Sequence, residues 1–173
     1  MNAHLIETVR HFTDTRKLVL VIGDVMLDRY LMGIVNRISP EAPVPVLLLN
    51  TSEERAGGAA NVAANLSGLG LSTQIIGCVG NDDAGKALKQ LIADAGINIA
   101  NIMTSNQRPT VSKTRVMSGN QQIVRIDDES SSAFTLDETN QLLIKVTNAL
   151  NAKPAMVILS DYAKGLLSEA TCQ

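Results

Sequence analysis

The sequence is poor in aromatic residues, histidines and cysteines, and each scarcity excludes a class of protein. With two Tyr, two Phe and no Trp, it offers no set of rings on which nucleic-acid bases could stack. His4 and His11 are the only histidines, and Cys78 and Cys172 are far apart, so neither a metal site nor a disulfide framework is indicated. The core must therefore consist mainly of aliphatic side chains.

Excess charge and long apolar runs are also missing. Lys and Arg number 15 against 17 Asp and Glu, a net charge of −2, which excludes a nucleic-acid binder held by bulk charge. No apolar run reaches the roughly 18 residues of a membrane span, and the first residues lack the apolar core of a signal peptide. We expect a soluble, cytoplasmic protein with no nucleic-acid or membrane partner. The 173 residues predict one domain.

Strand-like and helix-like segments alternate along the chain. Continuous apolar runs typical of buried parallel strands lie at 17–23, 73–79 and 155–160, with a further strand expected at 97–103. Periodic or glycine-bounded segments predict helices at 2–13, 57–69, 82–95 and 136–152, and another from Gly165 onward. This alternation predicts an α/β fold with a mostly parallel sheet between helices.

Two segments do not fit that alternation. The first, 28–50, is rich in proline and holds strand-like stretches at 28–35 and 44–50; proline confines such strands to sheet edges. The second, 110–127, predicts two strands joined in a hairpin at Gly119-Asn120. Together they predict a small separate sheet with one apolar face to cover, formed by Val35, Ile38, Val44, Val46, Val116 and Ile123.

A glycine pair opens the segment Gly57-Gly58-Ala59-Ala60-Asn61. Glycines allow a ligand to approach the backbone closely, and the N–H groups of a helix start can donate to it. The same composition also suits a helix that packs tightly through Gly and Ala. Both interpretations stay open from these residues alone.

Carboxylates follow two of the predicted parallel strands. Asp24 and Asp28 follow the first, and Asp161 precedes Lys164 after the last. Ligands gather at the carboxyl ends of the strands in open α/β sheets, so Asp28 is a candidate to accept hydrogen bonds from sugar hydroxyls. Asp161 and Lys164 could reach the same place. The alternative is that all of these residues belong to ordinary turns.

Three cations are predicted on the small sheet. Lys113 and Arg115 are two residues apart on one strand and so share a face, and Arg125 lies on the partner strand. Such a group suits a phosphate. The alternative is a solvated face on which these cations pair with Asp127, Asp128 and Glu129.

These motifs together resemble the ribokinase-like (PfkB) carbohydrate kinases. The run Gly57-Gly58-Ala59-Ala60-Asn61-Val62-Ala63 is similar to the first signature of that family, and Gly80-Asn81-Asp82-Asp83-Ala84-Gly85 to its Gly-x-Asp-x-x-Gly turn. The resemblance narrows to the family's heptose-7-phosphate kinase domains, often fused to an adenylyltransferase. It extends from about Leu18 onward and is carried by 23–30, 37–46, 120–125 and 159–165.

The resemblance implies a ribokinase-like fold with a small β lid that covers the sugar and mediates a homodimer. It implies transfer of the ATP γ-phosphate to the anomeric hydroxyl of D-glycero-β-D-manno-heptose 7-phosphate, in ADP-heptose and lipopolysaccharide core synthesis. By resemblance, the sugar contacts are Asp28, Gly57, Gly58 and Asn61, with Asp161 near an acidic contact. Lys113, Arg115 and Arg125 are candidates for the sugar phosphate by charge, and Lys164 is a further substrate-binding candidate.

The sequence departs from the family pattern in one respect. It contains neither Asp-Thr-x-Gly-Ala-Gly-Asp, which carries the family's catalytic base, nor the Asn-x-x-Glu element that organises magnesium. We therefore expect residues 1–173 to be the N-terminal part of a longer kinase that binds ATP and Mg²⁺ mostly beyond Gln173, and to be inactive alone. Another sugar kinase of this family and a non-catalytic sugar-binding module remain alternatives.

Overall fold

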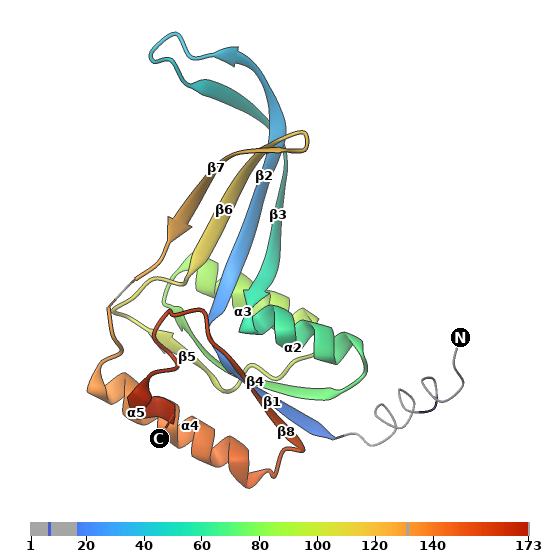
Figure 1. The fold of residues 1–173 in the computed structure, drawn as a ribbon, viewed down its shortest axis with the longest axis vertical. Coiled ribbons are helices and arrows are strands. Elements are labelled where there is room, and N and C mark those ends of the chain that lie inside the picture. Colours follow the sequence, from blue (N-terminus) through green and yellow to red (C-terminus); the bar gives the residue numbers. More distant parts are fainter. Residues whose placement is uncertain (1–6, 8–16, 131, 173) are drawn as a thin grey trace.

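The computed structural model describes residues 7, 17–130 and 132–172. The helix expected over 2–13 therefore lies, apart from Glu7, outside the described residues. The described chain forms two four-stranded sheets, one in a layered α/β body and one projecting from it (Figure 1). None of the described helices is both long and apolar enough to cross a bilayer.

The first sheet is parallel and carries helices on both faces. Its strands are β1 (Leu18–Gly23), β4 (Ser72–Gly80), β5 (Ile102–Ser105) and β8 (Met156–Ser160), in the order β5-β4-β1-β8. Alternate residues of a strand point to opposite faces, so Val21 packs towards α2 (Ala59–Gly68) and α3 (Asp83–Asp94), whereas Leu20 packs towards α4 (Leu136–Asn151). The expected α/β architecture is confirmed.

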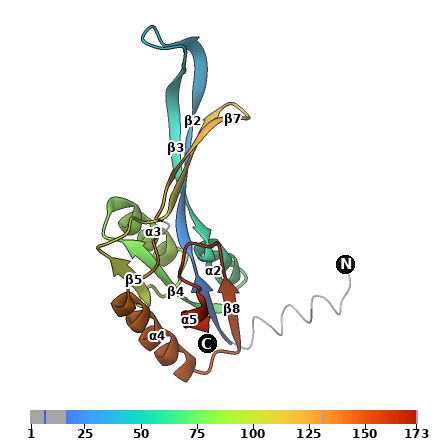
Figure 2. The ribbon, with the colours of Figure 1, turned by 60° about the vertical axis from the view of Figure 1, so that its left-hand side comes forward.

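The second sheet, which we call the projecting sheet, consists of β2 (Val25–Ile38), β3 (Pro45–Gly58), β6 (Ser112–Ser118) and β7 (Gln121–Asp128). Its order is β3-β2-β6-β7; β2 and β6 are parallel and the outer pairs antiparallel. Figure 2 shows it rising away from the parallel sheet. The hairpin expected at Gly119-Asn120 is confirmed, since Ser118 pairs with Gln121.

The outer ends of β2 and β3, beyond the last residue of β2 that pairs with β6, Gly33, form an arm over residues 34–49 that extends past β6 and β7 (Figure 1). In this arm Ile34 pairs with Leu48 and Val35 with Leu47. Consecutive pairs of an antiparallel ladder lie on opposite faces, so apolar side chains occupy both faces of the arm. The single apolar face expected from the sequence is wrong here. Exposed apolar residues of the arm are Ile34, Ile38, Val44, Leu48 and Leu49.

Some element boundaries also differ from the prediction. Helix α2 begins at Ala59 rather than at Gly57, because Gly57 and Gly58 still pair with β2. Gly58 has φ 58°, and a Cβ there would lie 2.3 Å from the Asp24 carbonyl oxygen, so the strand-to-helix junction requires glycine. The strand expected at 97–103 lies later, at Ile102–Ser105, and the helix expected from Gly165 begins at Glu169, as α5 (Glu169–Cys172).

Candidate functional site

A polar face lies on the projecting sheet next to the body. On this face Asp28 of β2 is the cross-strand neighbour of Lys113 on β6. The Arg115 Nη1 donates to Asp28 Oδ1 at 2.5 Å, and the two side chains are 24% and 20% exposed. This hydrogen bond raises the pKa of Arg115. The pair therefore fixes the Asp28 carboxylate while leaving part of it open to a ligand.

Gly57 makes room for that carboxylate. A Cβ at Gly57 would lie 2.3 Å from Asp28 Oδ2, far inside van der Waals contact, so any side chain here would push Asp28 away. Gly58 caps the start of α2, and Asn61 lies exposed in its first turn, where its amide oxygen accepts a hydrogen bond from Asn65 at 3.5 Å. The structure thus places Asp28 directly against the glycine pair.

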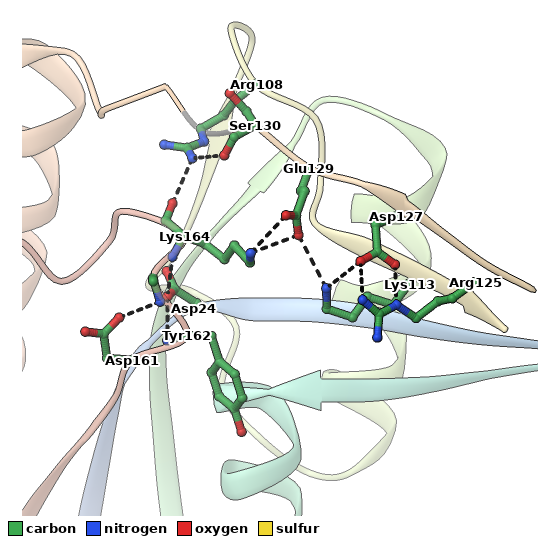
Figure 3. A network of polar contacts seen from close by, with 11 residues as sticks. Asp24, Arg108, Lys113, Arg125, Asp127, Glu129, Ser130, Asp161, Tyr162 and Lys164 are labelled. Carbon is green, nitrogen blue, oxygen red and sulfur yellow. Dashed lines mark hydrogen bonds and ion pairs between the residues drawn. The ribbon is translucent and has the colours of Figure 1, made fainter.

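Five charged residues form a network between the projecting sheet and the loop after β8 (Figure 3). Lys164 Nζ lies 3.0 Å from both Glu129 carboxylate oxygens, and Lys113 Nζ lies 3.3 Å from Glu129 Oε2 and 3.2 Å from Asp127 Oδ2. Arg125 binds both oxygens of Asp127, at 2.8 and 2.9 Å. Lys164 and then Lys113 hold the pKa of Glu129 below its ordinary value.

The loop after β8 is fixed by the buried carboxylate of Asp24, which is 4% exposed. It accepts the backbone N–H groups of Tyr162 at 2.9 Å, Lys164 at 3.0 Å and Leu166 at 3.3 Å. These bonds hold a backbone that includes Ala163 at φ 57°, a left-handed conformation that costs a non-glycine residue free energy. The loop thereby directs Lys164 towards Glu129 (Figure 3).

Asp161 does not join this face. It is exposed, and its Oδ1 accepts the N–H of Ala163 at 2.8 Å. Figure 3 shows its carboxylate pointing away from Glu129 and Lys113. In this structure the Asp161 carboxylate closes a local turn of the loop, whereas Lys164 reaches the polar face through Glu129.

Asp82 fastens the segment that leads into the projecting sheet. Its carboxylate caps α3 through the Gly85 N–H at 2.7 Å and accepts the Thr110 N–H and hydroxyl at 2.8 and 2.7 Å. Burial alone would raise the pKa of Asp82, but these hydrogen bonds outweigh burial and lower it. Asp82 of the Gly-x-Asp-x-x-Gly turn therefore has a structural role that the sequence did not assign.

The three cations expected to bind a phosphate share one face, on which Arg115 and Arg125 are direct cross-strand neighbours, but each cation is paired with a carboxylate. Arg115 is engaged by Asp28, and Arg125 by Asp127 on its own strand. Sequence reasoning named Glu129 only as a partner of surface charges and did not foresee that it bridges Lys113 to Lys164. No signal in the sequence indicated that bridge, since the two lysines are 51 residues apart and only the tertiary fold aligns them.

Magnesium was expected for the intact enzyme. Within residues 7, 17–130 and 132–172, no three His, Cys, Asp or Glu side chains converge as ligands. The carboxylates of the polar face are instead each engaged by a cation. The described residues therefore do not fit a magnesium site.

Comparison with known proteins identifies the family of the chain. A model described as "pfkB family carbohydrate kinase" matches residues 16–173. The bifunctional protein HldE of Methylobacillus flagellatus is 50% identical over 174 residues, covering 100% of this chain and 36% of that protein. The HldE protein of Azorhizobium caulinodans is 52% identical, covering 88% of this chain and 32% of its own length. The chain thus spans about a third of the curated relatives it matches.

Solved structures agree on the fold. A carbohydrate kinase from Agrobacterium tumefaciens superposes with a TM-score of 0.62 at 25% identity, over 83% of this chain and 45% of its own. The ribokinase of Arabidopsis thaliana, solved with ribose and ATP, superposes with a TM-score of 0.55 at 20% identity, over 83% of this chain and 53% of its own. The second likeness concerns the fold alone.

Proposed function

The chain belongs to the pfkB family of carbohydrate kinases, and from that premise we propose that the full-length protein transfers the γ-phosphate of ATP to the anomeric hydroxyl of D-glycero-β-D-manno-heptose 7-phosphate. The product is the 1,7-bisphosphate, used for ADP-heptose and lipopolysaccharide core synthesis. The proposal concerns the whole protein, because this chain spans only 36% of the HldE protein of M. flagellatus.

One observation carries the proposal for the sugar side. The Asp28 carboxylate lies against Gly57 and is held by Arg115. A fixed, partly exposed carboxylate accepts hydrogen bonds from two neighbouring hydroxyls, and a hydrogen bond to a charged group contributes about 1.5–3 kcal/mol. Asp28 therefore binds and orients the sugar, and Gly57 and Gly58 allow the ring to approach the backbone.

The chemistry divides between the two ligands. ATP supplies the phosphoryl group, and catalysis of this transfer consists mostly of positioning and charge stabilisation. The described residues position the sugar: Asp28 orients its hydroxyls, and Asp24 fixes the loop that carries Lys164. The carboxylates of the described residues do not form a site for Mg²⁺.

We also propose that the full-length protein is a homodimer joined through the arm of β2 and β3. Ile34, Leu48 and Leu49 are about half exposed, at 53%, 48% and 55%. Ile34 and Leu48 are a cross-strand pair on one face, and Leu49 lies on the other; neighbouring exposed apolar side chains are typical of an interaction surface. A second copy of the same arm, which offers matching apolar side chains, is the partner.

The test is an assay of the full-length protein with ATP, Mg²⁺ and heptose 7-phosphate, with the bisphosphate detected by phosphorus NMR. We expect phosphorylation at the anomeric carbon, and Asp28→Ala should weaken heptose-phosphate binding by about tenfold or more. Lys86→Met, on the exposed face of α3, is the control and should bind as the wild type does. Turnover of ribose or fructose in place of the heptose would refute the substrate and favour another sugar kinase of the family.

A further inference from the structure

Lys113 and Lys164 belong to different parts of the fold but meet at one carboxylate. We propose that these two lysines form the subsite for the phosphate of the phosphorylated sugar, and that Glu129 occupies this subsite until the phosphate displaces it. This assignment rests on the proposed function. It adds the position of the phosphate, which the sequence left open among several cations.

The two ammonium groups are arranged around one acceptor. Lys113 Nζ is 3.3 Å from Glu129 Oε2, and Lys164 Nζ is 3.0 Å from both oxygens of the same carboxylate. The lysine side chains are only 17% and 21% exposed, so both are held in place. A planar carboxylate with two oxygens thus marks a position where another oxyanion can receive hydrogen bonds from both lysines.

The other cations of the face are less suited to this role. Arg115 is engaged with Asp28, which needs it for orientation. Arg125 makes a two-pronged contact with Asp127 and is 50% exposed. Releasing Arg115 would leave Asp28, which is 20% exposed, without its partner, whereas Glu129 is 32% exposed and is therefore more readily solvated when it is displaced.

Glu129 is the partner that a phosphate can replace. It follows Asp128, the last residue of β7, and so lies beyond the ladder that ends where Ser112 pairs with Asp128. A phosphate monoester carries about −1.5 to −2 charges and three acceptor oxygens at neutral pH, against one charge and two oxygens for Glu129. Two lysines therefore bind the phosphate more strongly than the carboxylate.

The subsite also lies at a suitable distance from the sugar. Lys113 is the direct neighbour of Asp28 across the parallel strands β2 and β6, and neighbouring strands of a sheet lie about 5 Å apart. A sugar whose hydroxyls contact Asp28 can therefore place a phosphate from the far end of its carbon chain against Lys113 and Lys164. Because Lys164 comes from the body, the phosphate would also join the projecting sheet to the body.

Calorimetric titration of the full-length protein without ATP tests the subsite. Heptose 7-phosphate and unphosphorylated heptose are compared on the wild type, Lys113→Met, Lys164→Met, Glu129→Gln and the control Lys86→Met. We expect Lys113→Met and Lys164→Met each to weaken the binding of heptose 7-phosphate about tenfold. The affinity for unphosphorylated heptose should stay the same. Glu129→Gln should tighten binding of the phosphorylated sugar several-fold, because the competing carboxylate is neutralised.

The outcomes separate this proposal from the function on which it rests. If folded Lys113→Met and Lys164→Met keep the wild-type preference for the phosphorylated sugar, the subsite is refuted even where heptose kinase activity is present. Unchanged or weaker binding by Glu129→Gln refutes the displacement. If the protein turns over no heptose phosphate, a titration with inorganic phosphate decides: binding that depends on both lysines supports the subsite, and binding independent of them refutes it.

Discussion

Thr110 donates both its backbone N–H and its hydroxyl to the carboxylate of Asp82, at 2.8 and 2.7 Å. The same hydroxyl accepts the N–H of Gly80 at 2.8 Å. Asp82 thus joins the end of β4, the start of α3 and the segment before β6. This carboxylate is therefore one of the contacts that fasten the projecting sheet to the body, which has consequences for stability and its dependence on pH.

Asp82→Asn should lower the free energy of unfolding of the full-length protein by about 2 kcal/mol at pH 7, because hydrogen bonds to a charged acceptor become hydrogen bonds to a neutral one. The folded-state pKa of Asp82 is lowered, so its stabilisation is complete above the unfolded pKa of about 4 and is lost as pH falls through the folded value. Denaturant unfolding of the wild type and of Asp82→Asn from pH 7 to 3 measures the difference in their free energies of unfolding. If that difference does not shrink below pH 4, the ionised Asp82 carboxylate is not its cause.

Gly57→Ala should weaken heptose-phosphate binding about tenfold, because the new methyl group would lie 2.3 Å from Asp28 Oδ2 and displace that carboxylate. Gly68→Ala is the matched control: a Cβ there meets nothing within 4 Å, and alanine in place of glycine stabilises a helix by up to about 1 kcal/mol. Calorimetric titration and thermal melting of both variants check the pair. Equal affinities in folded proteins would show that Asp28 tolerates the methyl group.

Asp24→Ala should destabilise the full-length protein by about 3 kcal/mol or more, since three backbone N–H groups of the loop after β8 lose their acceptor. Asp161→Ala, in the same loop, removes one exposed hydrogen bond to Ala163 and should cost less than about 1 kcal/mol. Denaturant unfolding compares the two variants. Similar losses for both would mean that Asp24 does not fix the loop.

Leu48→Asp should convert the proposed full-length dimer to a monomer, because a charge on the apolar arm must be desolvated in the interface. Leu69→Asp introduces the same charge at a residue that is 62% exposed beyond the end of α2 and should leave the dimer intact. Sedimentation velocity at micromolar concentration distinguishes the two states. A wild type that sediments as a monomer would refute the dimer itself.

Local sequence patterns predicted most of the elements. The apolar run at 17–23 became β1, and the hairpin at Gly119-Asn120 formed as expected, because burial on both faces and turn chemistry are encoded within a few residues. The patterns were less reliable at junctions. Gly57 and Gly58 remained in β3 because their pairing with Met26 and Val25 extends the strand, and that pairing depends on residues 31 or more positions away.

The sequence by itself determined the α/β class and which residue types are available to bind a phosphorylated sugar. It indicated Lys113 and Arg115 as candidates because strand periodicity fixes which residues share a face, and Asp28 because it follows a buried strand. Only the tertiary structure decided how those charges pair: Arg115 with Asp28, and Glu129 between Lys113 and Lys164. Ion pairing acts over a few ångströms, and those distances arise from strand register and from the loop that the buried Asp24 fixes, rather than from spacing along the chain.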